Sequence, residues 1–511
     1  MTPMRAQPSW LVTLLVITAA VANLRWPNAG VGLTLGLGYL GWCAWLAGGV
    51  LAPRQPRRWQ LLVGLLGHLA LLAVAGALSY WGYRLNGKTV AVLVAALPLV
   101  WLALPRESGK PETDVWQRDA LRGLPRTMGV TTWLMLGFFG LVALAFSQLI
   151  AAATAEAIRT PWQVVAPTFW VAFAGAAAAL LGLHLRTDRA GRRLLCTLLL
   201  IALAGSVALV VYPLGYGFDP FIHQAAERAI AATGVITPKT PYYVGQYALV
   251  VPLARLLGLP TTTVDRTAAL AGVLLVSALA YWPWRRHHPT AAALPLVILL
   301  LPLGSVIATT PQGLANLWLL ATALAVTLRQ TPVAETPRLR WLPFSLLTAA
   351  AAVVTHPVAG VPAFSLVGFG LIARWRGAAR GAVRFGPRLA RLAVFALAAT
   401  ALPLLFLVNA KRLGQNPADV WQPWSPQSLT AAAAPAVLPS LPASTQPLLD
   451  FAAGLAANRG WLLVALAALG VGQLRTARKT AGALPVVATS VALMAASAAL
   501  RQMRFPQLVA E

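Results

Sequence analysis

Apolar runs of about 20 residues recur along the whole chain, and short polar segments separate them. Twenty residues of helix rise about 30 Å, which matches the hydrocarbon thickness of a bilayer. The runs are continuous rather than alternating, which excludes a membrane-spanning β-barrel. We therefore predict an all-α, polytopic transmembrane helix bundle of about 15 spans. The predicted spans cover residues 9–24, 30–51, 60–80, 89–104, 129–153, 163–183, 194–213, 262–282, 291–308, 314–329, 342–355, 357–373, 389–409, 460–474 and 481–500.

The composition agrees with this pattern, because 58% of the residues are hydrophobic and only 10% are charged. The formal net charge of +27 raises the question of nucleic-acid binding. The cations, however, lie in short loops between apolar runs rather than on one polar face. They therefore indicate membrane topology, with membrane lipids and no nucleic acid as the partner.

Alternate loops differ in their density of arginine and lysine, which predicts the side of the membrane that each loop faces. With the N-terminus inside, 27 of the 40 cations fall on the inner side, in loops around Arg54, Arg118, Arg189, Arg285, Arg338, Arg380 and Arg478. The long loop over residues 212–261 then faces outward. This assignment requires that residues 245–259 do not cross the membrane, so we predict an interfacial helix on the outer surface there. We expect a multi-pass protein of a bacterial-type inner or plasma membrane.

The outward loop contains a cluster of titratable residues near its start. Asp219 precedes Pro220, which is typical of a helix N-cap followed by the first helical residue. We predict a helix from residue 220 to about 232. His223 and Glu227 are four residues apart on this helix and share one face, with Asp219 at its near end. Two interpretations stay open: a catalytic group at the membrane edge, or a capping aspartate beside an exposed His–Glu pair.

Beyond this helix the loop offers groups suited to a phosphate. Lys239 lies between two prolines, which favour an extended path and present its ammonium group. Tyr242, Tyr243 and Tyr247 follow. Such residues are also typical of the aromatic belt at lipid headgroups, and we favour that interpretation for Tyr247.

Three further outer segments belong to this region. Asp265 and Arg266 open the next span, where they either pair with each other, which we favour for Asp265, or face the same cavity. The sequence Thr355-His356-Pro357 interrupts an apolar run near the outer face, and His356 either points into the site or is simply hydrogen-bonded. Residues 410–459 are rich in proline and predict an irregular lid or vestibule wall.

These features together resemble a known family. An acidic residue just after a transmembrane helix, a short helix, a Lys-Pro-type segment with aromatics, an interfacial helix ending in Gly-Leu-Pro, and an arginine opening the next span are similar to the GT-C superfamily. Its members are membrane glycosyltransferases that use polyprenyl-phosphate sugars. The resemblance implies that Asp219 activates the acceptor or binds a divalent metal such as Mg²⁺ or Mn²⁺. It also implies that Lys239 meets the lipid-linked phosphate and that Arg266 matches the arginine of the next helix.

The chain departs from the superfamily in two places. The outer turn TTPQG at residues 309–313 lacks the second acid that such a turn often carries. Seven predicted spans precede the loop, where the superfamily usually has one. We divide the chain into an N-terminal transmembrane extension (1–193), a GT-C-like core that holds the catalytic loop (194–409), an outer loop or lid (410–459) and a C-terminal transmembrane pair (460–511).

The expected function is transfer of a sugar from a polyprenyl-phosphate donor to a glycan, lipid or protein acceptor on the outer face. Because a polyprenyl phosphate is already a good leaving group, one base suffices for an inverting displacement. A transporter or lipid flippase and a catalytically inactive membrane scaffold remain the alternatives. The candidate catalytic residues are Asp219, His223 and Glu227, and the candidate substrate-binding residues are Lys239, Tyr242, Tyr243, Gln246, Arg228, Arg266 and His356.

Overall fold

The computed structural model describes eleven stretches of the chain and scattered positions between residues 389 and 411. Within these stretches every regular element is a helix, so the predicted all-α class is confirmed there. The predicted lid over 410–459 and the last two predicted spans lie outside the described residues. The stretches are 10–26, 28–106, 129–158, 160–186, 190–217, 219–237, 239, 243–281, 289–300, 309–330 and 340–378.

Six of the helices are long and apolar enough to cross a membrane, namely Ala29–Leu51, Arg57–Gly82, Val130–Ala151, Thr168–Arg186, Gly191–Val211 and Thr261–Tyr281. This is consistent with a helical membrane protein. The elements in chain order are α1 (Trp10–Arg25), α2 (Ala29–Leu51), α3 (Arg57–Gly82), α4 (Gly87–Ala103), α6 (Val130–Ala151), η1 (Pro161–Gln163), α7 (Thr168–Arg186), α8 (Ala190–Val211), α9 (Asp219–Thr233), α10 (Val244–Leu257), α11 (Thr261–Tyr281), η2 (Pro289–Leu300), α13 (Pro311–Gln330), α14 (Trp341–Thr355) and α15 (Pro357–Ala378). Where a span was predicted over residues 291–308, the described part, η2, is a 3₁₀ helix.

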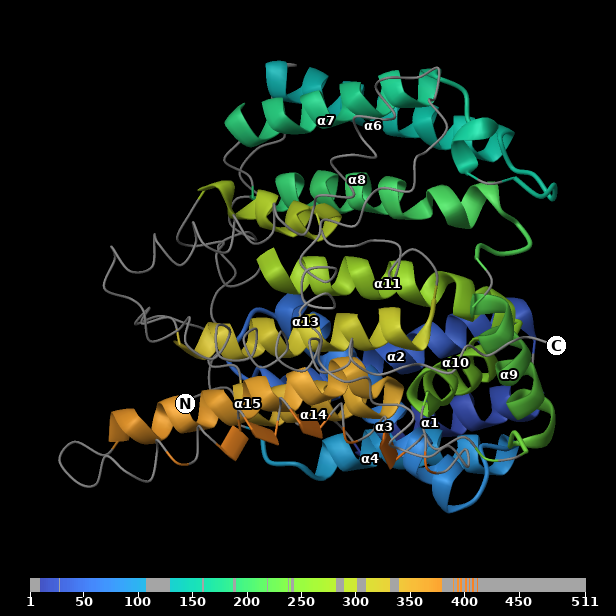
Figure 1. Ribbon diagram of the computed structural model, residues 1–511, viewed down its shortest axis with the longest axis vertical. Helices are drawn as coiled ribbons and strands as arrows, with labels where there is room; N and C mark the ends of the chain where they lie inside the picture. The colour runs from blue at the N-terminus through green and yellow to red at the C-terminus, as the bar shows by residue number, and fades with distance from the viewer. Residues whose placement is uncertain are drawn as a thin grey trace, which may run out of the picture. The chain divides into compact units, whose positions relative to one another are not determined.

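The chain forms two compact units, residues 1–360 and residues 361–511. In the first unit α10 packs against α2, α3, α11 and α14, and α1 packs against α2 and α4. The long helices run side by side in Figure 1, and α9 lies at one end of them. The predicted N-terminal extension, residues 1–193, therefore shares a unit with residues 194–360 of the predicted core.

The hairpin of α2 and α3 shows how closely these helices approach each other. A Cβ atom at Gly48 would overlap the backbone carbonyl of Gln60, and one at Gly64 would overlap that of Ala44. The Gln60 amide closes the turn by donating to the carbonyl oxygens of Ala52 and Pro53, at 3.2 and 3.0 Å. Small residues at these positions let two apolar helices pack backbone to backbone, as is common in membranes.

The ends of the helices group as the charge pattern predicts. At one end, the Arg340 amide donates to the Leu51 carbonyl at 2.8 Å and the Arg340 guanidinium to the Pro105 carbonyl at 3.1 Å. These bonds join the C-terminal ends of α2 and α4 to the start of α14. We call this end of the unit, where Leu51, Pro105 and Arg340 lie, the arginine end. At the α9 end, the Leu85 amide donates to the Gly234 carbonyl at 2.8 Å. The contacts agree with the predicted alternation of loops, whereas the side of the membrane that each end faces stays a prediction.

The prediction that residues 245–259 form a helix on the outer surface is wrong. The helix α10 exists, but twelve of its fourteen residues are buried inside the unit. A Cβ atom at Gly76 of α3 would lie 2.9 Å from the Ala248 Cβ, and the Asn23 amide of α1 donates to the Leu256 carbonyl at 2.7 Å. The physical reason is that α10 is apolar almost all the way round, and such a helix is stable only where other helices surround it.

Candidate functional site

The helix α9 forms where the sequence predicts it, from Asp219 to Thr233. Its buried residues include His223, Gln224 and Glu227, which are 7%, 4% and 0% exposed. The predicted shared face of His223 and Glu227 is thus confirmed, and it points into the protein rather than to solvent. The helix ends before Gly234, which has φ +83° and therefore adopts the left-handed conformation that glycine accommodates without strain.

Asp219 and His223 lie close together at the start of α9. The His223 Nε2 atom lies 3.5 Å from Asp219 Oδ1, and the Asp219 side chain is 65% exposed. The other ring nitrogen, Nδ1, forms a 2.8 Å hydrogen bond with the buried Tyr247 hydroxyl of α10. Burial lowers the pKa of His223, while the neighbouring Asp219 carboxylate opposes this shift. The Asp219 carboxylate is therefore exposed, and burial begins at His223, one helical turn further on.

Tyr243 and His356 complete the wall around His223. The Tyr243 ring stacks on His356 with centroids 5.0 Å apart and contacts His223 edge-on at 6.1 Å. His356 Nδ1 accepts a hydrogen bond from the Val358 amide at 3.2 Å, so this histidine also caps the start of α15. Burial lowers the pKa of His356 to about 4, which keeps its ring neutral. His356 is thus both hydrogen-bonded and beside the candidate site.

A second cluster of polar side chains lies buried between α9, α10 and α11. The Gln246 Nε2 atom donates to Glu227 Oε1 and to Asp265 Oδ1, at 3.0 Å in each case. Gln224 Nε2 donates to the other oxygen of Asp265, also at 3.0 Å. Because Gln246, Glu227 and Asp265 are at most 1% exposed, this cluster ties the three helices together in a site that excludes water.

The two carboxyl groups of this cluster cannot both carry a charge at low cost. Burial and the neighbouring Asp265 carboxylate raise the pKa of Glu227 well above its ordinary value. The Glu227 Oε2 atom is shielded from solvent, and a hydrogen bond with the Asp265 side chain raises the pKa of Glu227 further. Glu227 is therefore protonated at neutral pH, and its role is to hold α9 in place rather than to act as a base.

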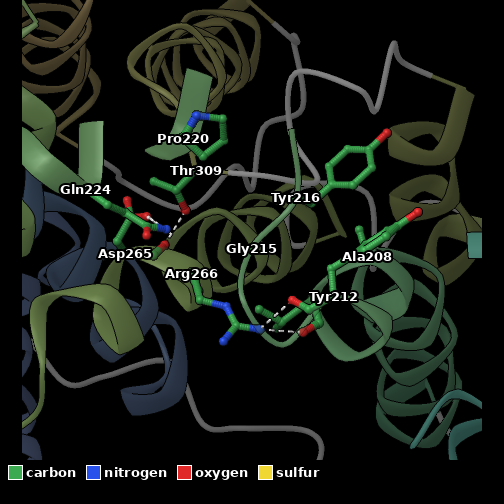
Figure 2. A pocket seen from close by; sticks show the side chains of 10 residues that line it. Ala208, Tyr212, Gly215, Tyr216, Pro220, Gln224, Asp265, Arg266 and Thr309 are labelled. Atoms are coloured by element: carbon green, nitrogen blue, oxygen red, sulfur yellow. Dashed lines mark hydrogen bonds between the residues drawn. The ribbon is translucent and has the colours of Figure 1, made fainter. Parts of the chain in front are cut away.

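The predicted pairing of Asp265 with Arg266 is wrong. Figure 2 shows the Arg266 guanidinium turned toward the end of α8 and Asp265 turned toward Gln224. Arg266 donates to the carbonyl oxygens of Pro213, Leu209 and Tyr212, at 2.5, 2.8 and 3.1 Å. The physical reason is that the last carbonyls of α8 have no partner within their own helix, and a guanidinium satisfies several of them at once.

A small pocket opens between Arg266 and the start of α9. Thr309, from the turn that was expected to carry a second acid, lines it and donates through its hydroxyl to the Asp265 carbonyl oxygen. Asp265, which we predicted to pair with Arg266, is thus the acid near this turn. The pocket is lined by Ala208, Leu209, Tyr212, Gly215, Tyr216, Pro220, Gln224, Asp265, Arg266 and Thr309 (Figure 2).

The two candidate phosphate-binding cations lie apart from this pocket. The Lys239 ammonium group donates to the carbonyl oxygens of Tyr83 and Trp81, at 2.7 and 3.3 Å, and so binds the C-terminal end of α3. Arg228 is exposed on the outer face of α9. Tyr242 lies outside the described residues. Among the described residues, no group of three or more His, Cys, Asp or Glu side chains is placed to hold a metal ion.

The site therefore consists of two linked parts that the fold brings together from distant segments. One is an open Asp219–His223 pair backed by Tyr247, Tyr243 and His356, and the other is a buried carboxyl cluster that fixes α9 from below. Comparison of the chain with protein-family models, with curated proteins and with solved structures finds no match, so no family is shown for it.

Proposed function

We propose that the protein is a membrane glycosyltransferase that moves a sugar from a polyprenyl-phosphate donor to a glycan, lipid or protein acceptor. The observation that carries the proposal is the Asp219–His223 pair, in which an exposed carboxylate lies 3.5 Å from a buried imidazole. A base must reach the acceptor hydroxyl, and the exposure of Asp219 permits this. The His223 ring beside it must keep one orientation, and the hydrogen bond between His223 Nδ1 and the Tyr247 hydroxyl holds that orientation.

The hydrogen bonds assign a role to each member of this pair. When the Tyr247 hydroxyl donates to His223 Nδ1, the proton of the neutral ring sits on Nε2, which faces Asp219. That N–H orients the Asp219 carboxylate, which in this scheme accepts a proton from the acceptor hydroxyl as the acceptor attacks the sugar. His223 is in this scheme a positioning residue, and Glu227, which is protonated and buried, is one as well.

The donor phosphate needs a cation and no general acid, because it leaves as an anion. Lys239 uses two of its three N–H donors on the carbonyls of α3, which leaves one for a phosphate oxygen. Arg228, exposed on α9, supplies a second positive charge on the same side of the unit. The apolar helix surfaces suit a polyprenyl chain.

Transport is the less favoured function. A transporter places its charged groups near the middle of the bilayer, whereas the charged side chains of this site gather where α8, α9 and α11 end or begin. A buried carboxyl pair also occurs in proton-coupled carriers, but here its hydrogen bonds hold three helix segments together at that same end.

The test is a transfer assay in membranes that contain the protein and a labelled polyprenyl-phosphate sugar. Asp219→Asn keeps the size of an exposed side chain, so folding is preserved, and it removes the base. We expect the transfer rate to fall about 100-fold or more. Ala225→Ser, on the exposed face of α9, is the matched control and leaves the rate unchanged. An Asp219→Asn rate equal to that of the wild type excludes the proposed base.

A further inference from the structure

The arginine end holds a charged group that the proposed function does not use. Arg106 follows the C-terminal end of α4, and its side chain runs back along the last turns of α2. Its guanidinium carbon lies 5.5 Å from the centre of the Trp45 ring. Its Nε atom lies 3.7 Å from the position of a Cβ built on Gly49. The absence of a side chain at Gly49 therefore makes the room that the guanidinium occupies.

Two donors of this guanidinium are shielded from solvent and have no hydrogen-bond partner among the described residues. They are Nε and Nη2 of Arg106. These two atoms share one edge of the planar group, and that edge binds a carboxylate or a phosphate through two parallel hydrogen bonds. Burial lowers the pKa of Arg106, but a guanidinium stays protonated. A guanidinium edge whose two donors are shielded from solvent, with no partner among the described residues, is costly unless an anion binds there.

The surrounding charges favour an anion from outside the described chain. The four acidic residues that the structure describes are Glu156, Asp219, Glu227 and Asp265, and all belong to the opposite, α9 end of the unit. Near Arg106, by contrast, the Arg340 guanidinium lies 3.1 Å from the Pro105 carbonyl oxygen and adds positive charge.

The position along the helices identifies the kind of anion. Arg106 lies at the ends of α2 and α4, and α2 is long and apolar enough to span a membrane. The ends of membrane-spanning helices lie at the level of the lipid headgroups, where phosphate groups are abundant. Tryptophan is also enriched at this level, as Trp45 is here.

We propose that Arg106, beside Trp45 and Arg340, forms a binding site for a phosphate group, supplied by the headgroup of an anionic membrane phospholipid. The Nε–H and Nη2–H groups bind two phosphate oxygens, and the Trp45 ring covers one face of the guanidinium. A free phosphate ion shares this chemistry, so the experiment below separates the two sources. The site is independent of the proposed transferase activity.

The test measures binding of a fluorescent phosphatidylglycerol to the purified full-length protein in zwitterionic nanodiscs. Arg106→Gln is expected to weaken the binding about 10-fold or more, which corresponds to about 1.4 kcal/mol. Arg106→Lys is expected to weaken it nearly as much, because lysine is a point charge without the two parallel donors. The matched control is Arg57→Gln, an exposed arginine at the same end, which should change affinity less than 2-fold.

The outcomes are distinct. Loss of binding in both Arg106 variants, with no competition by millimolar inorganic phosphate, supports the lipid site. Loss of binding in both variants, together with competition by millimolar inorganic phosphate, indicates that the site binds a soluble phosphate ion and overturns the lipid assignment. Unchanged binding in Arg106→Gln overturns the proposal, as does an equal loss in Arg57→Gln, which would indicate non-specific attraction. Glu107 is the next residue in the sequence. Glu107→Gln should leave binding unchanged, and a large gain in affinity would show that this carboxylate fills the guanidinium edge and would overturn the proposal. The melting temperature in zwitterionic lipid verifies that each variant is folded.

Discussion

Replacing Gln246 with leucine should destabilise the protein more than any other single change to a neutral side chain of the site. Its amide nitrogen bridges the Glu227 and Asp265 carboxyl groups, with a 3.0 Å hydrogen bond to each. Leucine has a similar volume, so the change removes the bridge without a large cavity. In the variant the two buried carboxyl groups keep one amide donor, that of Gln224, whereas the wild type has two.

The expected magnitude follows from these two bonds. At a pH where Asp265 is ionised, the bond to its carboxylate is worth about 1.5–3 kcal/mol, and the bond to the protonated Glu227 about 0.5–1.5 kcal/mol. Burial of the leucine side chain offsets part of this loss, by about 1 kcal/mol. The free energy of unfolding should therefore fall by about 1–3.5 kcal/mol. Because α9 is held by this cluster, the loss should appear first as increased amide exchange in α9.

The assay is denaturant unfolding in detergent, followed by hydrogen exchange of the folded protein. Leu253→Met, also on α10 but outside the polar cluster, is the matched control and should change the free energy of unfolding by less than about 1.5 kcal/mol. A loss in Gln246→Leu no larger than in this control, with unchanged exchange in α9, would refute the view that the cluster holds the helix.

Three further predictions follow from the same contacts. Gly48→Ala should lower the free energy of unfolding by about 1–3 kcal/mol, because the added Cβ atom overlaps the α3 backbone. The control is Gly38→Ala on the same helix, where the added Cβ atom meets open space, and it should be neutral or stabilising in the same measurement. Folded wild-type protein keeps the Glu227 proton that the unfolded chain releases near pH 4.3, so its stability should decline as pH rises from about 4.3 toward the raised pKa. Glu227→Gln should flatten this decline, and equal slopes in the two unfolding profiles would contradict the assignment. Tyr247→Phe removes the 2.8 Å bond to His223 and should cost about 1–2 kcal/mol in chemical unfolding; a neutral result would mean that this bond does not fix the ring.

The sequence predicts the local features of the site well. The start of α9 and the shared face of His223 and Glu227 follow from an Asp-Pro start and a four-residue spacing, which depend only on neighbouring residues. The inward direction of this face does not follow from them. The grouping of helix ends follows from arginine-rich loops, a property of the chain as it crosses a membrane. Both predictions need no knowledge of which helices touch.

The sequence does not predict the contacts between distant segments. Asp265 meets Gln224 across 41 residues, and pairing it with the adjacent Arg266 was the simpler local interpretation. The all-round apolar character of α10 is visible in the sequence and indicates burial. The arginine distribution favoured a surface helix instead, because a crossing there would place Arg285 and the later arginine clusters outside. A signal for the buried cluster was present in Gln246, because an uncharged amide within an apolar helix needs a partner inside the protein.

The most direct test of the central claim is the release of polyprenyl phosphate from a labelled donor by purified protein, compared between the wild type and Asp219→Asn. The account predicts acceptor-dependent release by the wild type and about a hundredth of that rate or less in the variant. Release that proceeds equally fast without the Asp219 carboxylate, or no release by the wild type with any polyprenyl-phosphate sugar, would contradict it.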